Sequence, residues 1–166
     1  GVQTCALPIS DQNNADHLSQ LTDQKIEAFD LVVINLYPFA ATIASGASFE
    51  ECIEQIDIGG PSMLRGAAKN HGSVAVISDP SQYPALFMAI AHGGFTLEDR
   101  QELALETFKR TAQYDSAISQ WLNKQLGKTE FRERSWTKVS DLRYGENPHQ
   151  TAALYRSEEH TSELQS

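Results

Sequence analysis

The residues around Asp57 have the types and spacing that acid/base chemistry requires. Asp57 stands just before Gly59, Gly60 and Pro61, and Lys69 follows about one short helix later. A carboxylate and an amine accept and donate protons, and paired glycines let backbone come close to a ligand. The pattern predicts chemistry on a small polar substrate. The strand end that contains Tyr37 is expected to supply a further wall of the site.

Each of these residues also has a simpler interpretation that the sequence leaves open. Asp57 suits an ordinary turn before a helix, with Gly60 near the cap. Lys69 suits a solvated lysine at a helix C-terminus, and Tyr37 an aromatic side chain that packs at the end of a strand. His71 suits a capping group, because no residues with metal-ligand spacing surround it and no metal is predicted.

The hydrophobic pattern alternates between strands and helices. Residues 29–36 and 73–78 are continuous apolar runs, typical of strands buried on both faces of a parallel sheet. Helices are expected over residues 15–26, 49–56, 61–70, 82–91 and 96–126. This rhythm predicts an α/β fold with a parallel sheet and flanking helices. Two or three strands make a small sheet, so we expect the N-terminal half of the domain to be missing.

The longest expected helix should bury one apolar stripe, and a capping box should start the helix before Asp57. Ser48 is followed three residues later by Glu51, the pairing that caps a helix N-terminus. On the long helix, the residues expected to form the core stripe are Leu105, Phe108, Ala112, Ile118 and Leu122.

The two ends of the chain are expected to be translated sequencing adapter. Residues 1–9 can be encoded by GGA GTT CAG ACG TGT GCT CTT CCG ATC. The reverse complement of that DNA, with one base added in front, encodes residues 156–164. We therefore set both ends aside in the fold prediction, and Arg156 is ambiguous between insert and adapter.

Composition excludes several classes of protein. The formal net charge is −9, which disfavours nucleic-acid binding because that requires a basic face. Of the two cysteines, Cys5 falls in the expected adapter and Cys52 stands alone, so a reducing cytoplasm is predicted. No apolar run approaches the length of a membrane span.

Five ordered motifs give the chain a family resemblance. They are residues 35–39 (NLYPF), 56–61 (IDIGGP), 67–71 (AAKNH), 111–115 (TAQYD) and 142–150 (LRYGENPHQ). In order and spacing they resemble the AICAR transformylase/IMP cyclohydrolase family of bifunctional purine biosynthesis enzymes. The resemblance implies a methylglyoxal-synthase-like α/β fold, of which the chain would hold the C-terminal half, followed by the start of a transformylase domain.

The resemblance also implies a domain organisation. It assigns residues 10–126 to a partial cyclohydrolase domain and 142–156 to the start of the transformylase domain. Residues 127–141 between them are polar and charged and are expected to form a linker, and the expected adapter residues are 1–9 and 157–166. The full-length family forms homodimers in the cytoplasm. Its two reactions transfer a formyl group from 10-formyltetrahydrofolate to AICAR and close formyl-AICAR to IMP with loss of water. The cyclohydrolase needs no cofactor, and the folate is a co-substrate of the other domain.

Individual roles follow from the matching motifs. Lys69 resembles the proton donor and acceptor of the cyclohydrolase, Asp57 the carboxylate that orients the reacting amide and formyl groups, and Tyr37 the site tyrosine. Positions that the resemblance places against substrate are Ile34, Asn35, Ile58, Gly59 and Gly60 in the cyclohydrolase, and Arg143 and Tyr144 in the AICAR site of the transformylase.

Two expectations limit these assignments. In the family, the phosphate-binding elements and a second site lysine precede the position of Asp11, so we expect the chain alone to bind nucleotide weakly. The competing interpretation is a methylglyoxal-synthase-like regulatory domain that binds a small effector. The paired Asp57 and Lys69 and the 143–150 segment disfavour it, since a regulatory module needs neither.

Overall fold

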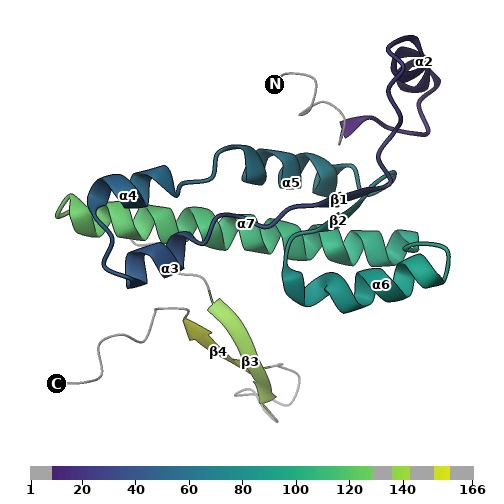
Figure 1. The fold of residues 1–166 in the computed structure, drawn as a ribbon. Helices are drawn as coiled ribbons and strands as arrows, with labels where there is room; N and C mark the ends of the chain where they lie inside the picture. Colours follow the sequence, from purple (N-terminus) through teal and green to yellow (C-terminus); the bar gives the residue numbers. More distant parts are fainter. Residues whose placement is uncertain (1–8, 129–135, 143–151, 158–166) are drawn as a thin grey trace. The chain divides into compact units, whose positions relative to one another are not determined.

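A computed structural model describes residues 9–128, 136–142 and 152–157 of the chain (Figure 1). The chain forms two compact units, Gly1–Tyr114 and Asp115–Ser166. Helix α7 (Leu97–Gln125) continues across the boundary between them.

The first helix, α2 (Ala15–Asp23), begins where the sequence predicts. The Asn14 side chain caps it by accepting hydrogen bonds from the backbone N–H groups of Asp16 and His17. The helix ends three residues before the predicted end, because Gln24 caps it and Lys25 adopts a left-handed conformation with φ of 55°.

Strands β1 (Leu31–Val33) and β2 (Ala75–Ile77) pair in parallel, which confirms the predicted sheet direction. Both strands are shorter than the apolar runs that contain them. All three residues of β2 are buried, but Val33 of β1 is 43% exposed. The expectation that both strands are buried on both faces was therefore wrong for β1, which in the described residues has β2 as its neighbour on one edge.

Two short helices follow β1. Helix α3 (Phe39–Ala44) begins directly after Pro38 and was not predicted. Helix α4 (Phe49–Glu54) has the predicted capping box: Ser48 Oγ accepts the Glu51 N–H, and the Glu51 carboxylate accepts the Ser48 N–H. Local sequence alone specifies this helix start, since both partners lie within four residues.

Helix α5 (Gly59–Lys69) lies alongside the two strands (Figure 1) and packs against β2. Pro61 stands in its first turn, as predicted, where a missing N–H leaves no helical hydrogen bond unmade. Leu64, Ala67 and Ala68 are fully buried. The two alanines allow the helix backbone to approach the strands closely. The core cluster they join is Val32, Leu64, Ala67, Ala68, Val74, Val76 and Ala104.

A short 3-10 helix, η2 (Pro80–Gln82), leads from β2 into α6 (Tyr83–Ala91). Asp79 caps η2 by accepting the Ser81 N–H. Helix α6 ends before Gly93 and Gly94, whose φ angles of 93° and 112° favour glycine. The helix predicted over residues 82–91 is confirmed, and it begins one residue later than expected.

The face of α7 that packs in the first unit differs from the predicted stripe. Thr107 and Thr111 are fully buried and Ala104 is nearly so, whereas Leu105 is 55% exposed and Phe108 is 37% exposed. Ala112 is exposed as well. The stripe prediction was wrong here because it followed the largest apolar side chains. Small and β-branched residues one position away make the close contact instead, and Arg65 of α5 covers the Phe108 ring, with Cζ 5.5 Å from its centroid.

The second unit contains an antiparallel pair, β3 (Trp136–Leu142) and β4 (Ala152–Ser157). Strand β4 starts at Ala152, in the segment that the resemblance assigns to the start of the transformylase domain. The expected linker 127–141 contains most of β3, so polar composition alone did not reveal this strand. The register shifts between Lys138 and Ser140, as at a β-bulge.

Candidate functional site

The carboxyl ends of the parallel strands β1 and β2 lie at the same edge of the sheet, which is where open α/β sheets bind ligands. The Ile34 N–H donates to the Ile77 carbonyl at 3.0 Å and extends the pairing by one residue. Asn35 follows, is exposed, and its Nδ2 donates to the Tyr83 hydroxyl at 2.8 Å. This bond ties the segment after β1 to the start of α6. Tyr83 was not a candidate from the sequence, because its partner lies 48 residues away.

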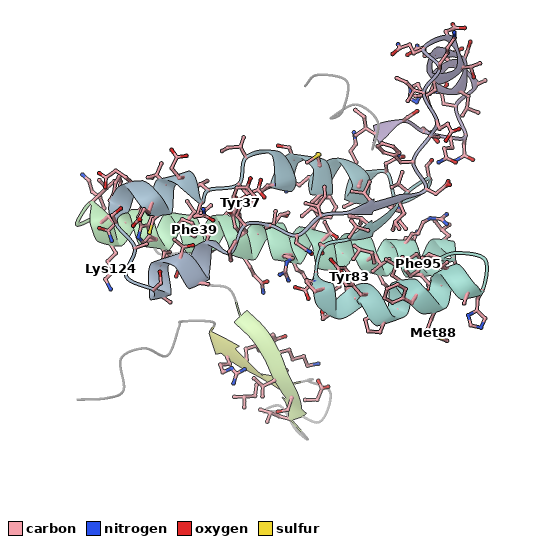
Figure 2. The ribbon with its side chains drawn as sticks, viewed as in Figure 1. Tyr37, Phe39, Tyr83, Met88, Phe95 and Lys124 are labelled. Carbon is pink, nitrogen blue, oxygen red and sulfur yellow. The ribbon has the colours of Figure 1, made fainter. Side chains whose placement is uncertain are left out.

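Tyr37 lies on the segment that joins β1 to α3, and Phe39 is the first residue of α3 (Figure 2). Tyr37 is 52% exposed, so its ring is accessible to a ligand, whereas Phe39 is 1% exposed. The Phe39 N–H donates to the Tyr37 carbonyl at 2.8 Å, which makes a tight turn around Pro38. The fold therefore presents Tyr37 outward and anchors the next aromatic residue inward.

Asp57 lies in the loop between α4 and α5, half-buried at the N-terminus of α5. Its Oδ1 accepts the Gly60 N–H at 2.7 Å. Helix N-termini attract negative charge, because their first N–H groups are free and the helix dipole is positive there. The ordinary interpretation of Asp57 as a turn and cap residue is thus realised, and the carboxylate still has a second oxygen to offer a ligand.

Gly60 is the residue that makes room for this carboxylate. A Cβ at position 60 would lie 2.3 Å from Asp57 Oδ2 and 2.9 Å from Oδ1. Gly59 has no such restriction, because its nearest atom would be Met63 Cε at 3.9 Å. Ile58 is 77% exposed beside them. Of the expected substrate positions, Gly60 therefore contacts the Asp57 side chain, and Ile58 and Gly59 lie between these two residues in the chain.

Tyr114 on α7 forms two hydrogen bonds to the loop that contains Asp57. Its hydroxyl accepts the Asp57 N–H at 2.8 Å and donates to the Gln55 carbonyl at 3.1 Å. Its ring meets the Phe39 ring edge-on, with centroids 6.2 Å apart. One side chain thus contacts both the loop of Asp57 and the residue that follows Tyr37 and Pro38.

Lys69 lies at the other end of α5 from Asp57. A helix rises 1.5 Å per residue, so Gly59 and Lys69 are about 15 Å apart along the axis. Lys69 is exposed, and within the described ranges no hydrogen bond or ion pair of its ammonium is found. The structure does not bring Asp57 and Lys69 together as a direct acid/base pair. The length of the predicted helix could have shown this.

The C-terminus of α5 is secured by its neighbours. The His71 ring Nδ1 lies 3.1 Å from the Ala68 carbonyl, as in the capping interpretation of this residue. Arg100 donates to the carbonyls of His71 at 2.8 Å and Gly72 at 3.2 Å. The His71 contact serves a carbonyl in the last turn of the helix, and the two bonds from Arg100 hold the turn that follows it.

An ion pair that was not predicted lies just after the carboxyl end of β2. Asp79 Oδ2 forms a salt bridge with Arg110 Nη1 of α7. Hydrogen bonds from Ser81 first, and the Arg110 charge after them, lower the pKa of the Asp79 carboxyl below its ordinary value. The Asp79–Pro80 pair is a sequence signal for a helix cap, but nothing in the sequence pairs Asp79 with Arg110.

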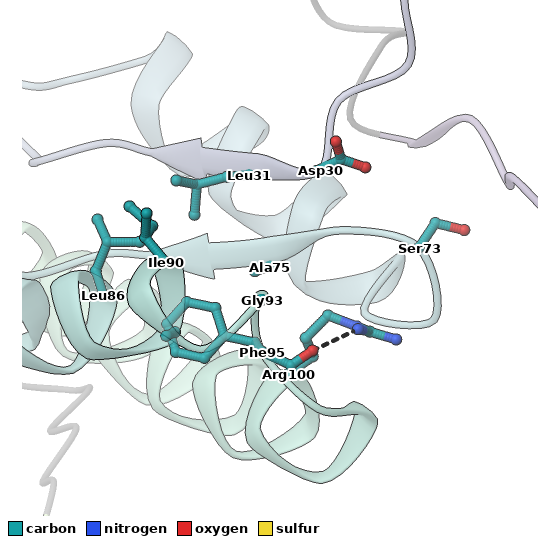
Figure 3. A pocket seen from close by; sticks show the side chains of 11 residues that line it. Asp30, Leu31, Ser73, Ala75, Leu86, Ile90, Gly93, Phe95 and Arg100 are labelled. Carbon is teal, nitrogen blue, oxygen red and sulfur yellow. Dashed lines mark hydrogen bonds between the residues drawn. The ribbon is translucent and has the colours of Figure 1, made fainter.

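A hollow of about 390 Å³ lies at the opposite edge of the sheet, where β1 and β2 begin (Figure 3). Asp30, Ser73, Phe95 and Arg100 are among the residues that line it. No residue predicted for the site lines it. Arg100 donates to the Phe95 carbonyl at 2.9 Å besides its two other carbonyl bonds, so this guanidinium organises its own chain.

Two further findings concern the predicted site. Among the residues that the structure describes, no group of three or more His, Cys, Asp or Glu side chains could hold a metal ion. In the same part of the chain, no helix is long and apolar enough to cross a membrane. Arg143 and Tyr144 lie outside the described residues.

Comparison with known proteins gives two family matches. The AICARFT/IMPCHase bienzyme family matches residues 67–166, and the MGS-like domain matches residues 2–62. Both ranges reach into the ends that the sequence assigned to adapter, and the domain boundaries stay predictions.

The chain is also similar to curated proteins and to a solved structure. It is 51% identical over 154 residues to the bifunctional purine biosynthesis protein PurH of Mycobacterium marinum, and 50% identical over the same length to that of Mycobacterium ulcerans. Each alignment covers 89% of this chain and 29% of the relative, so the chain spans under a third of their length. A solved structure described as the crystal structure of ForH is 30% identical, with a TM-score of 0.58, and the alignment covers 72% of this chain and 63% of that one.

Proposed function

The chain belongs to the AICARFT/IMPCHase bienzyme family, and from that membership we propose that it supplies part of a site that closes formyl-AICAR to IMP with loss of water. The observation that carries the proposal is the Asp57 carboxylate at the N-terminus of α5, held by the Gly60 N–H at 2.7 Å. The carboxylate is half-buried, next to exposed backbone at Ile58 and Gly59.

The reaction needs a group that orients two reacting atoms. The carboxamide nitrogen of the substrate attacks the formyl carbon, so one proton leaves that nitrogen and one reaches the departing oxygen. A fixed carboxylate can accept a hydrogen bond from the amide N–H and align it for attack, and alignment alone lowers the barrier substantially. One oxygen of the Asp57 carboxylate accepts the Gly60 N–H, and this hydrogen bond fixes the orientation of the other oxygen.

We propose that the segment after β1 supplies the wall that faces a planar nucleotide base. Tyr37 presents an exposed ring that can stack or donate a hydrogen bond. Ile34 and Asn35 precede it at the carboxyl edge of the sheet. The substrate class we propose is therefore a small nucleotide, with its base between the segment after β1 and the loop before α5.

Lys69 keeps the proton-transfer role that the family resemblance implies, in a modified form. Because α5 separates it from Asp57 by about 15 Å, the two residues act on different atoms of the site and not as a hydrogen-bonded pair. Its exposed ammonium is available to a substrate group near the C-terminus of α5.

The second activity of the family extends the proposal beyond this chain. The formyl transfer uses 10-formyltetrahydrofolate as co-substrate, and Arg143 and Tyr144 would contact AICAR in that site. We propose a cytoplasmic, homodimeric full-length enzyme for this reaction. The antiparallel pair β3 and β4 would then belong to the beginning of the transformylase domain.

A chimera tests the cyclohydrolase proposal. Residues 10–155 replace the matching segment of the Mycobacterium marinum relative, and IMP formation from formyl-AICAR is measured. Asp57→Asn keeps an oxygen for the Gly60 N–H but removes the charge, so we expect kcat to fall about 100-fold. Asp23→Asn, an exposed aspartate at the end of α2, is the matched control and should leave kcat unchanged.

The result that would overturn the proposal is a chimera in which Asp57→Asn retains full kcat. An inactive parent chimera that is nevertheless folded would count against it equally. The 166-residue chain by itself, which spans 29% of its relatives, should form IMP far more slowly than the chimera.

A further inference from the structure

The loop that contains Asp57 is bridged by two half-buried hydrogen bonds to Tyr114, which have no part in the proposed reaction so far. We propose that Tyr114 is a positioning residue: its hydroxyl fixes the loop between α4 and α5, and thereby the orientation of the Asp57 carboxylate. The catalytic part of this inference rests on the proposed cyclohydrolase function, whereas the loop-holding part does not.

The hydroxyl of Tyr114 uses both its acceptor and its donor on the same loop. It accepts the Asp57 N–H at 2.8 Å and donates to the Gln55 carbonyl at 3.1 Å. These two backbone groups are two residues apart and lie between helices, where no helical hydrogen bond serves them. One side chain therefore replaces the backbone pairing that regular structure would provide.

Tyr114 is itself held on two sides. On α7 it continues the buried row Ala104, Thr107 and Thr111, at the spacings of three and four residues that keep side chains on one helix face. Its ring meets Phe39 edge-on at 6.2 Å, and Phe39 is 1% exposed. The hydroxyl is thus presented to the loop by a ring that has little freedom to turn.

The position of the loop controls the carboxylate directly. Asp57 Oδ1 reaches the Gly60 N–H at 2.7 Å while the Asp57 N–H is on Tyr114. The first of these bonds fixes the side chain of Asp57 and the second fixes its backbone. Without the hydroxyl, the Asp57 N–H and the Gln55 carbonyl lose their partner and the loop gains other conformations.

The first test uses the chain itself and needs no activity. Tyr114→Phe keeps the ring against Phe39 and removes only the hydroxyl. Hydrogen exchange measured by NMR should become faster at the Asp57 and Gly60 amides and stay unchanged at Val76 in the buried strand β2. Tyr155→Phe removes an exposed hydroxyl on β4 and is the matched control. Unchanged exchange at Asp57 in Tyr114→Phe overturns the inference.

The second test uses the chimera and separates positioning from a general structural effect. Misplacing a catalytic group by a small distance lowers kcat by about tenfold to a hundredfold, so Tyr114→Phe should lower kcat and leave KM within about twofold. A general loss of folding lowers the apparent kcat only in proportion to the unfolded fraction, so kcat is divided by the folded fraction measured by circular dichroism, and positioning requires this corrected kcat to fall.

A double variant gives the decisive comparison. If Tyr114 acts through Asp57, then Tyr114→Phe should lower kcat little further in an Asp57→Asn background. Effects that multiply fully contradict positioning through Asp57. If Asp57→Asn alone has no effect on kcat, the proposed function fails, and the exchange measurement still decides whether Tyr114 holds the loop.

Discussion

Asp57 Oδ1 lies 2.7 Å from the Gly60 backbone nitrogen, and the space that a Cβ at position 60 would need is filled by the same carboxylate. The two residues therefore depend on each other. Gly60 supplies a donor and leaves room, and Asp57 caps α5 with a charge that the helix N-terminus favours. A pair of residues that reads as a simple turn in the sequence is a fixed carboxylate site in the fold.

Substitution of the two adjacent glycines should separate these roles. Gly60→Ala places a Cβ 2.3 Å from Asp57 Oδ2, so the carboxylate must move, and we expect a loss of stability of about 1–3 kcal/mol from overpacking. Gly59→Ala meets only Met63 Cε at 3.9 Å and should stabilise the chain by about 0.5–1 kcal/mol through helix propensity. Urea unfolding of the chain measures both. Equal effects at the two positions would contradict the close contact at Gly60.

Asp57 and Lys69 should show no energetic coupling in the free chain. They lie at opposite ends of α5, about 15 Å apart. A double-mutant cycle with Asp57→Asn and Lys69→Gln, followed by urea unfolding, should give an interaction energy within about 0.5 kcal/mol of zero. Coupling between Asp57 and Lys69 above 1 kcal/mol would show that they form a direct pair after all.

The lowered pKa of the Asp79 carboxyl predicts how the free energy of unfolding depends on pH. Hydrogen bonds from Ser81 and then the charge of Arg110 lower its pKa in the folded state below the ordinary value of an aspartate. The carboxylate therefore stabilises the fold at pH values above its pKa in the unfolded chain. This stabilisation is lost as the pH falls through its lower pKa in the folded chain. Asp79→Asn keeps an acceptor for the Ser81 N–H and removes the charge.

The measurement compares the two proteins as the pH is lowered from 7 to below 3. Asp79→Asn should be less stable at pH 7 by under about 1 kcal/mol, since Arg110 is partly exposed. The difference should shrink in strong acid. A difference that stays constant over this range would exclude the Asp79 carboxylate as its source.

Two alanines on α7 test which face of this helix is packed. Ala104 is 4% exposed within the core cluster, whereas Ala112 is exposed. Ala104→Leu should destabilise the chain by about 1–3 kcal/mol through overpacking. Ala112→Leu should change the unfolding free energy by less than about 0.5 kcal/mol. Thermal unfolding measures the stability of both variants. A larger loss of stability in Ala112→Leu than in Ala104→Leu would support the stripe that the sequence predicted.

Features set by neighbouring residues were predictable from the sequence. The Ser48–Glu51 capping box, the start of α5 near Pro61 and the glycine stop after α6 all depend on atoms a few residues apart. The parallel pairing of β1 and β2 follows from two apolar runs separated by helices, since such a crossover favours parallel strands. The five motifs were enough to indicate the family, and the family match agrees with them.

Only the tertiary structure decided which side chains meet. The packed face of α7 differs from the predicted stripe, because close approach of helix and core selects Ala104, Thr107 and Thr111 over larger residues beside them. The contacts of Tyr114 with Asp57, Arg110 with Asp79 and Asn35 with Tyr83 join residues from 31 to 57 positions apart. No local pattern encodes such pairs. The sequence by itself determined that Asp57 stands just before a helix and that Lys69 lies near the end of that helix. The fold determined that Tyr114 holds Asp57 in place, because that contact exists only once α7 packs beneath the loop.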